Sequence, residues 1–201
     1  MSVKILGGEA KGFSFDIPPE SVTRPTSVLL KRRLFDYYQN LDGFYFIDLC
    51  SGSGSIALEA ASRGANPVLC IESSDKAFRV LKSNISRFND KFSHLDCEIN
   101  SEKIDVLKWI DKFKAFYLSL EEQEKKRIIL FFDPPYENLE LYKSFFSKIQ
   151  ALKFNGIVII EACRQKTLPI VDFEQEFGVP TRNYRQGTSF LFLYDYNNIK
   201  N

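Results

Sequence analysis

Residues 44–54 read F-Y-F-I-D-L-C-S-G-S-G, an apolar and aromatic run that breaks into alternating serine and glycine. The apolar part has the composition of a buried parallel strand. Gly52 and Gly54 permit a tight turn and a close approach of backbone to a ligand, because glycine carries no Cβ. Residues 56–63 are rich in good helix formers. The stretch therefore predicts a strand, a glycine turn and a helix whose first N–H groups form a partly positive cup.

A second strand is predicted over residues 67–71, and Glu72 follows it directly. An acid at the end of the second strand of such a unit can accept hydrogen bonds from ribose hydroxyls. This stretch therefore suggests a cofactor that contains a nucleoside. An ordinary strand–turn–helix unit with a surface glutamate is the alternative interpretation of these residues alone.

Apolar runs and helical patterns alternate along the rest of the chain. The predicted strands cover residues 3–6, 13–17, 95–99, 128–132 and 157–160, and the predicted helices cover residues 28–39, 75–88, 105–117 and 139–152. Residues 184–187 and 189–194 suggest a closing hairpin. This order predicts an α/β fold, a doubly wound and mostly parallel Rossmann-like sheet with a C-terminal antiparallel hairpin. We expect a single domain over residues 1–201, with a short N-terminal β extension (1–26) and a core (27–201).

Composition restricts the classes of protein that fit. The chain has 201 residues, 44% of them hydrophobic and 26% charged, with a net charge of +1, as in an ordinary soluble globular protein. Its single histidine, His94, argues against a histidine-dependent triad or metal site, and no metal is expected. No cysteine pair has C-x-x-C spacing, so reduced thiols are expected at Cys50, Cys70, Cys97 and Cys163. With neither a signal peptide nor a membrane-spanning run, a cytoplasmic monomer is expected.

Asp133-Pro134-Pro135-Tyr136 is the most informative tetrapeptide. It follows a predicted buried strand, so it lies at the carboxyl edge of the sheet, where ligands bind in open α/β folds. The two prolines stiffen the backbone there. The Asp133 carboxylate and the Pro134 carbonyl are then two fixed acceptors that can hold a planar –NH2 group and direct its lone pair at an electrophile. Tyr136 supplies a ring on which a flat base can stack.

Taken together, these motifs resemble those of the class I S-adenosylmethionine-dependent methyltransferases that act on exocyclic amino groups of nucleic-acid bases. The N-terminal residues Ile5-Leu6-Gly7-Gly8, Lys11-Gly12, Arg24-Pro25-Thr26 and Leu34-Phe35 resemble one family closely. This family is the RsmD-type methyltransferases, which modify guanine N2 in bacterial 16S ribosomal RNA. The resemblance covers essentially the whole chain. It departs at Val28-Leu29 and Lys31-Arg32, where the family usually carries an Asp-Arg pair and a later Arg-Glu.

The resemblance implies roles for individual residues. Ser51, Gly52 and Gly54 would wrap the methionine portion of S-adenosylmethionine, with Asp48 near its amino group. Glu72 would bind the ribose, and Asp105 the adenine amino group. The tetrapeptide of Asp133, Pro134, Pro135 and Tyr136 would hold the target guanine. Thr26 would close over the cofactor, and the expected RNA contacts are Arg24, Lys11, Lys31 and Arg32. These lie in a basic N-terminal arm whose charge fits a solvated face equally well.

The implied reaction is direct methyl transfer to an unpaired or flipped base of 16S rRNA, either naked or in an assembling small ribosomal subunit. Three alternatives remain open. The run from Gly52 to Ala57 also fits the dinucleotide fingerprint of a nicotinamide-dependent oxidoreductase. The protein could be a non-catalytic RNA-binding assembly factor. The same chemistry could also act on another amino group, such as adenine N6 in DNA or RNA or an amide in a protein.

Overall fold

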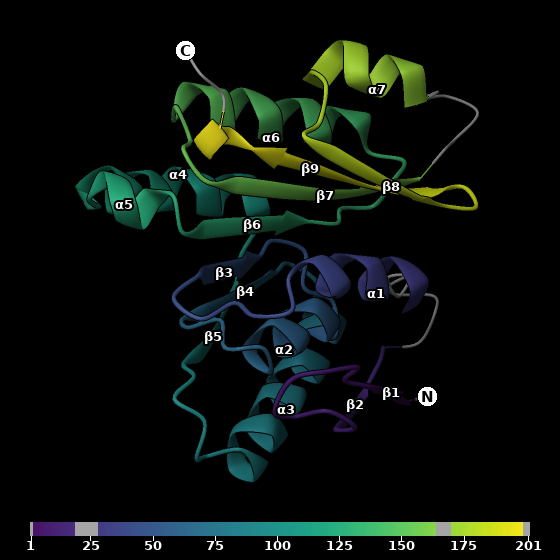
Figure 1. Ribbon diagram of the computed structural model, residues 1–201, viewed down its shortest axis with the longest axis vertical. Coiled ribbons are helices and arrows are strands. Elements are labelled where there is room, and N and C mark those ends of the chain that lie inside the picture. The colour runs from purple at the N-terminus through teal and green to yellow at the C-terminus, as the bar shows by residue number, and fades with distance from the viewer. Residues whose placement is uncertain (1, 19–27, 164–169, 199–201) are drawn as a thin grey trace.

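A seven-stranded sheet forms the centre of the computed structural model, which describes residues 2–18, 28–163 and 170–198 (Figure 1). The strand order is β5-β4-β3-β6-β7-β9-β8. The strands are β3 (Tyr45–Asp48), β4 (Val68–Glu72), β5 (Ile99–Lys103), β6 (Ile128–Phe132), β7 (Ile157–Cys163), β8 (Arg182–Gln186) and β9 (Ser189–Asp195).

The topology places one crevice at the centre of this sheet. Strands β5, β4, β3, β6 and β7 are parallel, and β9 and β8 add an antiparallel hairpin beside β7. The chain starts at β3, moves outward through β4 to β5, and returns to β6 on the other side of β3. Such a reversal of direction leaves a ligand-binding crevice between the carboxyl ends of the two central strands. The predicted fold class is confirmed.

Helices cover both faces of the sheet (Figure 1). One face carries α1 (Val28–Tyr37), α2 (Ser55–Ala61), α3 (Asp75–Lys91) and the hairpin of β1 (Ser2–Lys4) and β2 (Ser14–Asp16). The opposite face carries α4 (Val106–Ser119), α6 (Leu139–Ala151) and α7 (Ile170–Phe177). The short α5 (Glu122–Lys125) follows α4, and η1 (Tyr196–Asn198) follows β9. None of the helices in the described ranges is both long and apolar enough to cross a membrane.

Each face has its own apolar core, as expected for a doubly wound sheet. Alternate residues of a strand point to opposite faces. Accordingly Ile159 of β7 packs with the α2 side, and Ile160 packs with the α6 side. Aromatic rings dominate the second core, where Phe173 of α7 stacks on Phe192 of β9 with ring centroids 4.7 Å apart.

The clearest differences from the sequence prediction concern β5, β7 and α7, while most other element boundaries differ by one to three residues. The third strand of the core is residues 99–103, not 95–99. It is the polar edge strand I-N-S-E-K, held only by β4 on one side, and it carries no apolar run to reveal it. Strand β7 continues past residue 160 to Cys163, through Glu161. Ile170–Phe177 forms α7, a helix that was not predicted from the sequence.

A buried carboxylate fastens the N-terminal hairpin and α1 to α2. Glu59 of α2 is 0% exposed, and its Oε2 lies 3.0 Å from Nζ of Lys31, while Oε1 lies 2.9 Å from a guanidinium nitrogen of Arg63. The amides of Leu6 and Gly7 donate to the same two oxygens, each at 2.8 Å. This cluster joins the N-terminal hairpin, α1 and α2, the helix that follows the glycine turn.

Candidate active site

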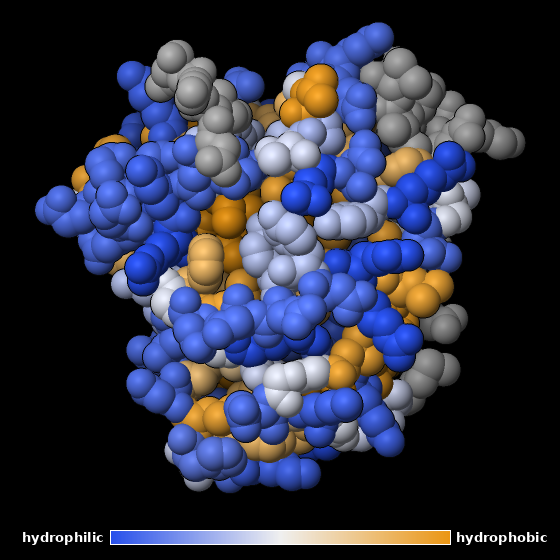
Figure 2. Space-filling model, viewed as in Figure 1, coloured by the Kyte–Doolittle hydropathy of each residue, from blue (hydrophilic) through white to orange (hydrophobic). Residues whose placement is uncertain are grey.

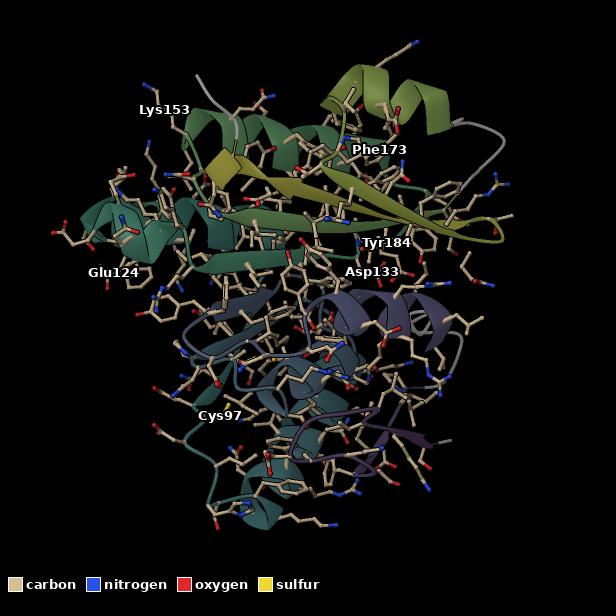
Figure 3. The ribbon with its side chains drawn as sticks, viewed as in Figure 1. Cys97, Glu124, Asp133, Lys153, Phe173 and Tyr184 are labelled. Atoms are coloured by element: carbon tan, nitrogen blue, oxygen red, sulfur yellow. The ribbon has the colours of Figure 1, made fainter. Side chains whose placement is uncertain are left out.

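A cavity of about 770 Å³ opens at the carboxyl edge of the sheet, between the ends of β3 and β6. Its walls come from the segments that follow β3, β4, β5 and β6, and Asp133 lies where β6 ends (Figure 3). Nine residues singled out from the sequence line it: Asp48, Ser51, Gly52, Glu72, Asp105, Asp133, Pro134, Pro135 and Tyr136. The topology therefore brings both sequence motifs to one cavity.

The glycine turn is shaped by backbone conformations that favour glycine. Gly52 and Gly54 have φ angles of +53° and +83°, in the left-handed region that side chains disfavour. The hydroxyl of Ser51 donates to the carbonyl of Asp48 at 2.8 Å, which closes the turn. Gly54 does not line the cavity. It is the N-cap of α2, and a Cβ there would come within 2.8 Å of Leu81.

Glu72 fixes the turn from the neighbouring strand. Its Oε2 accepts from the amide of Gly52 at 2.8 Å, and its Oε1 accepts from the amide of Ser74 at 2.7 Å. A carboxylate oxygen accepts more than one hydrogen bond, so each oxygen retains acceptor capacity toward the cavity. Glu72 can thus shape the turn and also receive ligand hydroxyls.

Among the described residues, five acidic side chains line the cavity and give it a negative potential: Asp48, Glu72, Asp105, Asp133 and Glu137. Burial, with the nearby charges of Asp133, Glu72, Asp48 and Asp105, raises the pKa of the Cys50 thiol well above its usual value. Burial also raises the pKa of Asp48 to about 7, although the amides of Ala57 and Cys50 donate to its carboxylate. Within the described ranges, no three such side chains are grouped closely enough to hold a metal ion. This potential favours an organic cation as ligand.

S-adenosylmethionine fits this donor set. It carries a sulfonium and an ammonium, both positively charged, and its ribose hydroxyls can donate hydrogen bonds to the carboxylate of Glu72. Asp105 stands at the far wall as the N-cap of α4, where its Oδ1 accepts from the amides of Leu107 and Lys108 at 3.0 and 3.2 Å. A carboxylate fixed in this way can also receive an amino group.

The tetrapeptide after β6 forms a rigid corner opposite the glycine turn. Pro135 accepts from the amide of Asn138 at 3.0 Å, which turns the chain into α6. The hydroxyl of Tyr136 donates to Oε1 of Glu161 at 2.8 Å. Burial, followed by the charges of Asp133 and Glu161, raises the pKa of Tyr136, so the phenol stays protonated. The corner presents a carboxylate and an aromatic ring to one cavity.

The residues predicted to contact RNA differ in their exposure and in their place relative to the cavity. Lys31 is 2% exposed and its ammonium bonds to Glu59 and to Ser55, so the prediction that Lys31 contacts RNA is wrong. Its burial lowers its pKa. Arg32 is exposed on α1. Lys11 is exposed too, but its turn packs on Ser62 at the end of α2 away from the cavity. Arg24 and Thr26 lie outside the described residues.

One buried acid near the site was missed from the sequence. Glu161 is 1% exposed and contacts Tyr136 from β7. The signal was present, because a lone glutamate interrupts the apolar run I-V-I-I-E-A-C. The cavity is also lined by Ile17, just after β2, and by Cys163.

Comparisons with known proteins agree with this geometry. The family model described as Conserved hypothetical protein 95 matches residues 3–194. The chain is 26% identical over 180 residues to the ribosomal RNA small subunit methyltransferase D of Escherichia coli K12, covering 89% of this chain and 78% of that protein. It is 27% identical over 164 residues to the protein of the same name in Buchnera aphidicola (subsp. Baizongia pistaciae), covering 80% and 76%.

A solved structure is similar along nearly its whole length. A hypothetical protein of Thermus thermophilus superimposes with a TM-score of 0.69 at 26% identity, covering 96% of this chain and 99% of that one. The chain belongs to the Conserved hypothetical protein 95 family, the RsmD-type class I methyltransferases.

Proposed function

We propose that this protein transfers a methyl group from S-adenosylmethionine to the exocyclic N2 amino group of a guanine in small-subunit ribosomal RNA. The single observation that carries the proposal is the cavity in which the glycine turn and Glu72 face the Asp133–Tyr136 corner. The names of the E. coli and Buchnera relatives support ribosomal RNA of the small subunit as the substrate.

The chain's part in cofactor binding is to offer a negative, preformed cradle. Gly52 and Ser51 provide closely approaching backbone, and Glu72 and Asp105 provide acceptors at two separate walls. When bound, S-adenosylmethionine supplies the methyl group on a sulfonium that leaves as a neutral thioether. Because the cradle's charge stabilises a cation, we expect the demethylated and less positive product to bind more weakly.

The corner after β6 would hold the acceptor amine. Asp133 and the carbonyl of Pro134 can each accept one hydrogen of the –NH2 group, and Tyr136 can stack on the purine ring. Orientation then supplies most of the catalysis. A new N–C bond forms as the methyl–sulfur bond breaks, and the proton that the nitrogen sheds passes to Asp133 and then to water.

The surface beside the cavity is suited to a polyanion. Of the residues that the structure describes, four arginines are exposed along the seam where α1 packs on β8: Arg32, Arg33, Arg182 and Arg185. The guanidinium of Arg182 lies 4.7 Å from the centre of the Tyr37 ring. Val28 and Leu29, 52% and 49% exposed, form an apolar spot at the start of α1 (Figure 2). Arginine and exposed apolar or aromatic groups together favour RNA backbone and unstacked bases.

The experiment is methylation of RNA by the purified protein with radiolabelled S-adenosylmethionine. Naked small-subunit rRNA and assembling subunits from cells lacking the protein serve as parallel substrates, and the product nucleoside is identified by mass spectrometry. N2-methylguanosine is expected. N6-methyladenosine would overturn the assignment of the base, and no incorporation into either substrate would overturn the proposed function.

A further inference from the structure

The carboxylate of Glu161 lies behind the proposed base platform. Glu161 is in β7, 1% exposed, and Oε1 accepts from the hydroxyl of Tyr136 at 2.8 Å. The last pair between β6 and β7 joins Phe132 to Ile160, so Glu161 stands one step further along, beside the start of the corner at Asp133. A buried acid thus adjoins the tetrapeptide that would hold the target amine.

Burying this acid carries a cost that the rest of β7 avoids. Its neighbours in the strand are apolar, and Ile159 and Ile160 are each 0% exposed. Removing a carboxylate from water is unfavourable unless specific partners compensate it. The hydroxyl of Tyr136 is one such partner of the Glu161 carboxylate.

The contact completes the restraint on the Tyr136 ring. Pro134 and Pro135 fix the backbone direction that leads into Tyr136, because each has a locked φ. They leave the two side-chain torsions of the tyrosine unconstrained. The hydroxyl bond to Glu161 fixes the opposite end of the ring, and Glu161 is itself tied down where the Tyr142 hydroxyl donates to its carbonyl at 3.0 Å.

From this geometry we propose that Glu161 is a positioning residue, which holds the Tyr136 ring in the orientation that stacks on the target base. The inference rests on the proposed function. Glu161 acts through Tyr136 and need not touch either reactant. What it requires is a hydrogen-bond acceptor at this place, so a neutral amide oxygen can substitute for the carboxylate.

The test is a double-mutant cycle with saturating S-adenosylmethionine, using Glu161→Leu, Tyr136→Phe and the two combined. Each single change removes the same hydrogen bond, so each should lower kcat/KM for RNA by about ten- to a hundredfold. The double variant should be no worse than either single variant, since residues that act as a unit are not additive. Calorimetry should give an unchanged Kd for S-adenosylmethionine in all three.

Two further variants separate positioning from stability. Glu161→Gln keeps an acceptor oxygen and should recover most of the lost activity. Tyr117→Phe is the matched control, because it removes a buried tyrosine hydroxyl that accepts from the amide of Asn155 outside the cavity, and it should lower Tm without changing kcat/KM for RNA. Additive losses in the cycle would overturn the proposal, as would a Glu161→Gln variant as impaired as Glu161→Leu.

The wild-type protein is assayed first on the same RNA. If it transfers no methyl group to any RNA, the proposed function fails and this role fails with it. If it is active but the variants show the contrary pattern, only the positioning role is refuted.

Discussion

The amide of Gly52 and the carboxylate of Glu72 are joined by a hydrogen bond of 2.8 Å that links the turn after β3 to the end of β4. The two residues are 20 positions apart in the chain. The other oxygen of Glu72 accepts from the amide of Ser74, so the carboxylate is clamped between two backbone donors. The acid proposed to bind ribose therefore also sets the shape of the turn.

Glu72→Gln should weaken cofactor binding more than it weakens the fold. A glutamine has one acceptor oxygen, so its NH2 group would face one of the two amide donors that the carboxylate now satisfies. We expect the Kd for S-adenosylmethionine to rise about tenfold or more, as when a charged hydrogen bond is lost. Titration calorimetry measures it. Unchanged affinity in the folded variant would refute the role of Glu72 in the cradle.

Asp133→Ala separates binding from chemistry. Asp133 lines the cavity on the corner, opposite the glycine turn. Its loss should reduce methyl transfer by roughly a thousandfold, the scale seen when one preorganised polar group is removed from an active site. Affinity for S-adenosylmethionine should change little. The matched control is Asp90→Ala, at an exposed carboxylate of α3. Equal loss of binding and transfer in folded Asp133→Ala would contradict the assignment.

The buried carboxyl of Asp48 makes stability depend on pH. Its pKa is raised from 3.8 to about 7, chiefly by burial, with the charge of Glu72 adding to it. Between these values the folded state holds a proton that the unfolded chain has lost. Stability from this group is therefore fully present below pH 3.8 and is lost as the pH rises through about 7, by about 4 kcal/mol in all.

Asp48→Asn isolates this effect. Urea unfolding of the ligand-free protein between pH 5 and pH 8 gives the free energy of unfolding for both proteins. The stability of the variant relative to wild type should improve as the pH rises from 5 to about 7 and level off above it, since the amide does not ionise. Parallel curves for the two proteins would show that the pKa of Asp48 is not raised in the folded state.

Some parts of the fold were predictable because their signal is local. Strand β6 is a continuous apolar run, and the prediction of residues 128–132 is confirmed to the residue. Strand β5 was misplaced because an edge strand with the sequence I-N-S-E-K needs only one partner and little burial. Its pairing with β4 supplies the hydrogen bonds that no pattern in its own residues indicates.

The site residues also differ in how far they could be predicted from the sequence. Asp48 and Glu72 end two of the strands and Asp133 follows a third, and the sequence predicts all three strands, so their meeting at one edge could be inferred. The burial of Lys31 could not be inferred from the sequence. Its burial depends on Glu59, 28 residues away on another helix, and adjacent Arg32 with the same sign of charge is exposed. Only the tertiary structure tells a structural cation from one that is available to RNA.

Removing the Glu59 carboxylate should damage the fold as a whole. Glu59→Leu would leave the buried ammonium of Lys31 without its counter-ion and the amides of Leu6 and Gly7 without an acceptor. Breaking a buried pair in this way costs about 3–5 kcal/mol of unfolding free energy. The control is Lys112→Ala, which breaks an exposed pair with Glu102 and should cost about 1 kcal/mol or less. Urea unfolding compares them, and similar costs would refute a structural role for the cluster.

Arg32 and Lys31 should behave oppositely in RNA binding. Arg32→Ala removes an exposed charge from the α1–β8 seam, so RNA affinity should fall and the slope of log K against log salt should lose about one unit. Lys114→Ala, at an exposed position on α4 across the sheet, should leave both quantities unchanged. Lys31→Met should lower Tm while leaving the salt slope of the folded protein as it is, because the ammonium of Lys31 is already bonded to Glu59.

Fluorescence anisotropy with labelled rRNA fragments over a range of salt concentrations measures RNA binding by all three variants. If Lys31→Met reduced the magnitude of the salt slope more than Arg32→Ala does, RNA binding would have to draw Lys31 out of its ion pair with Glu59, and the structural role of Lys31 would be refuted.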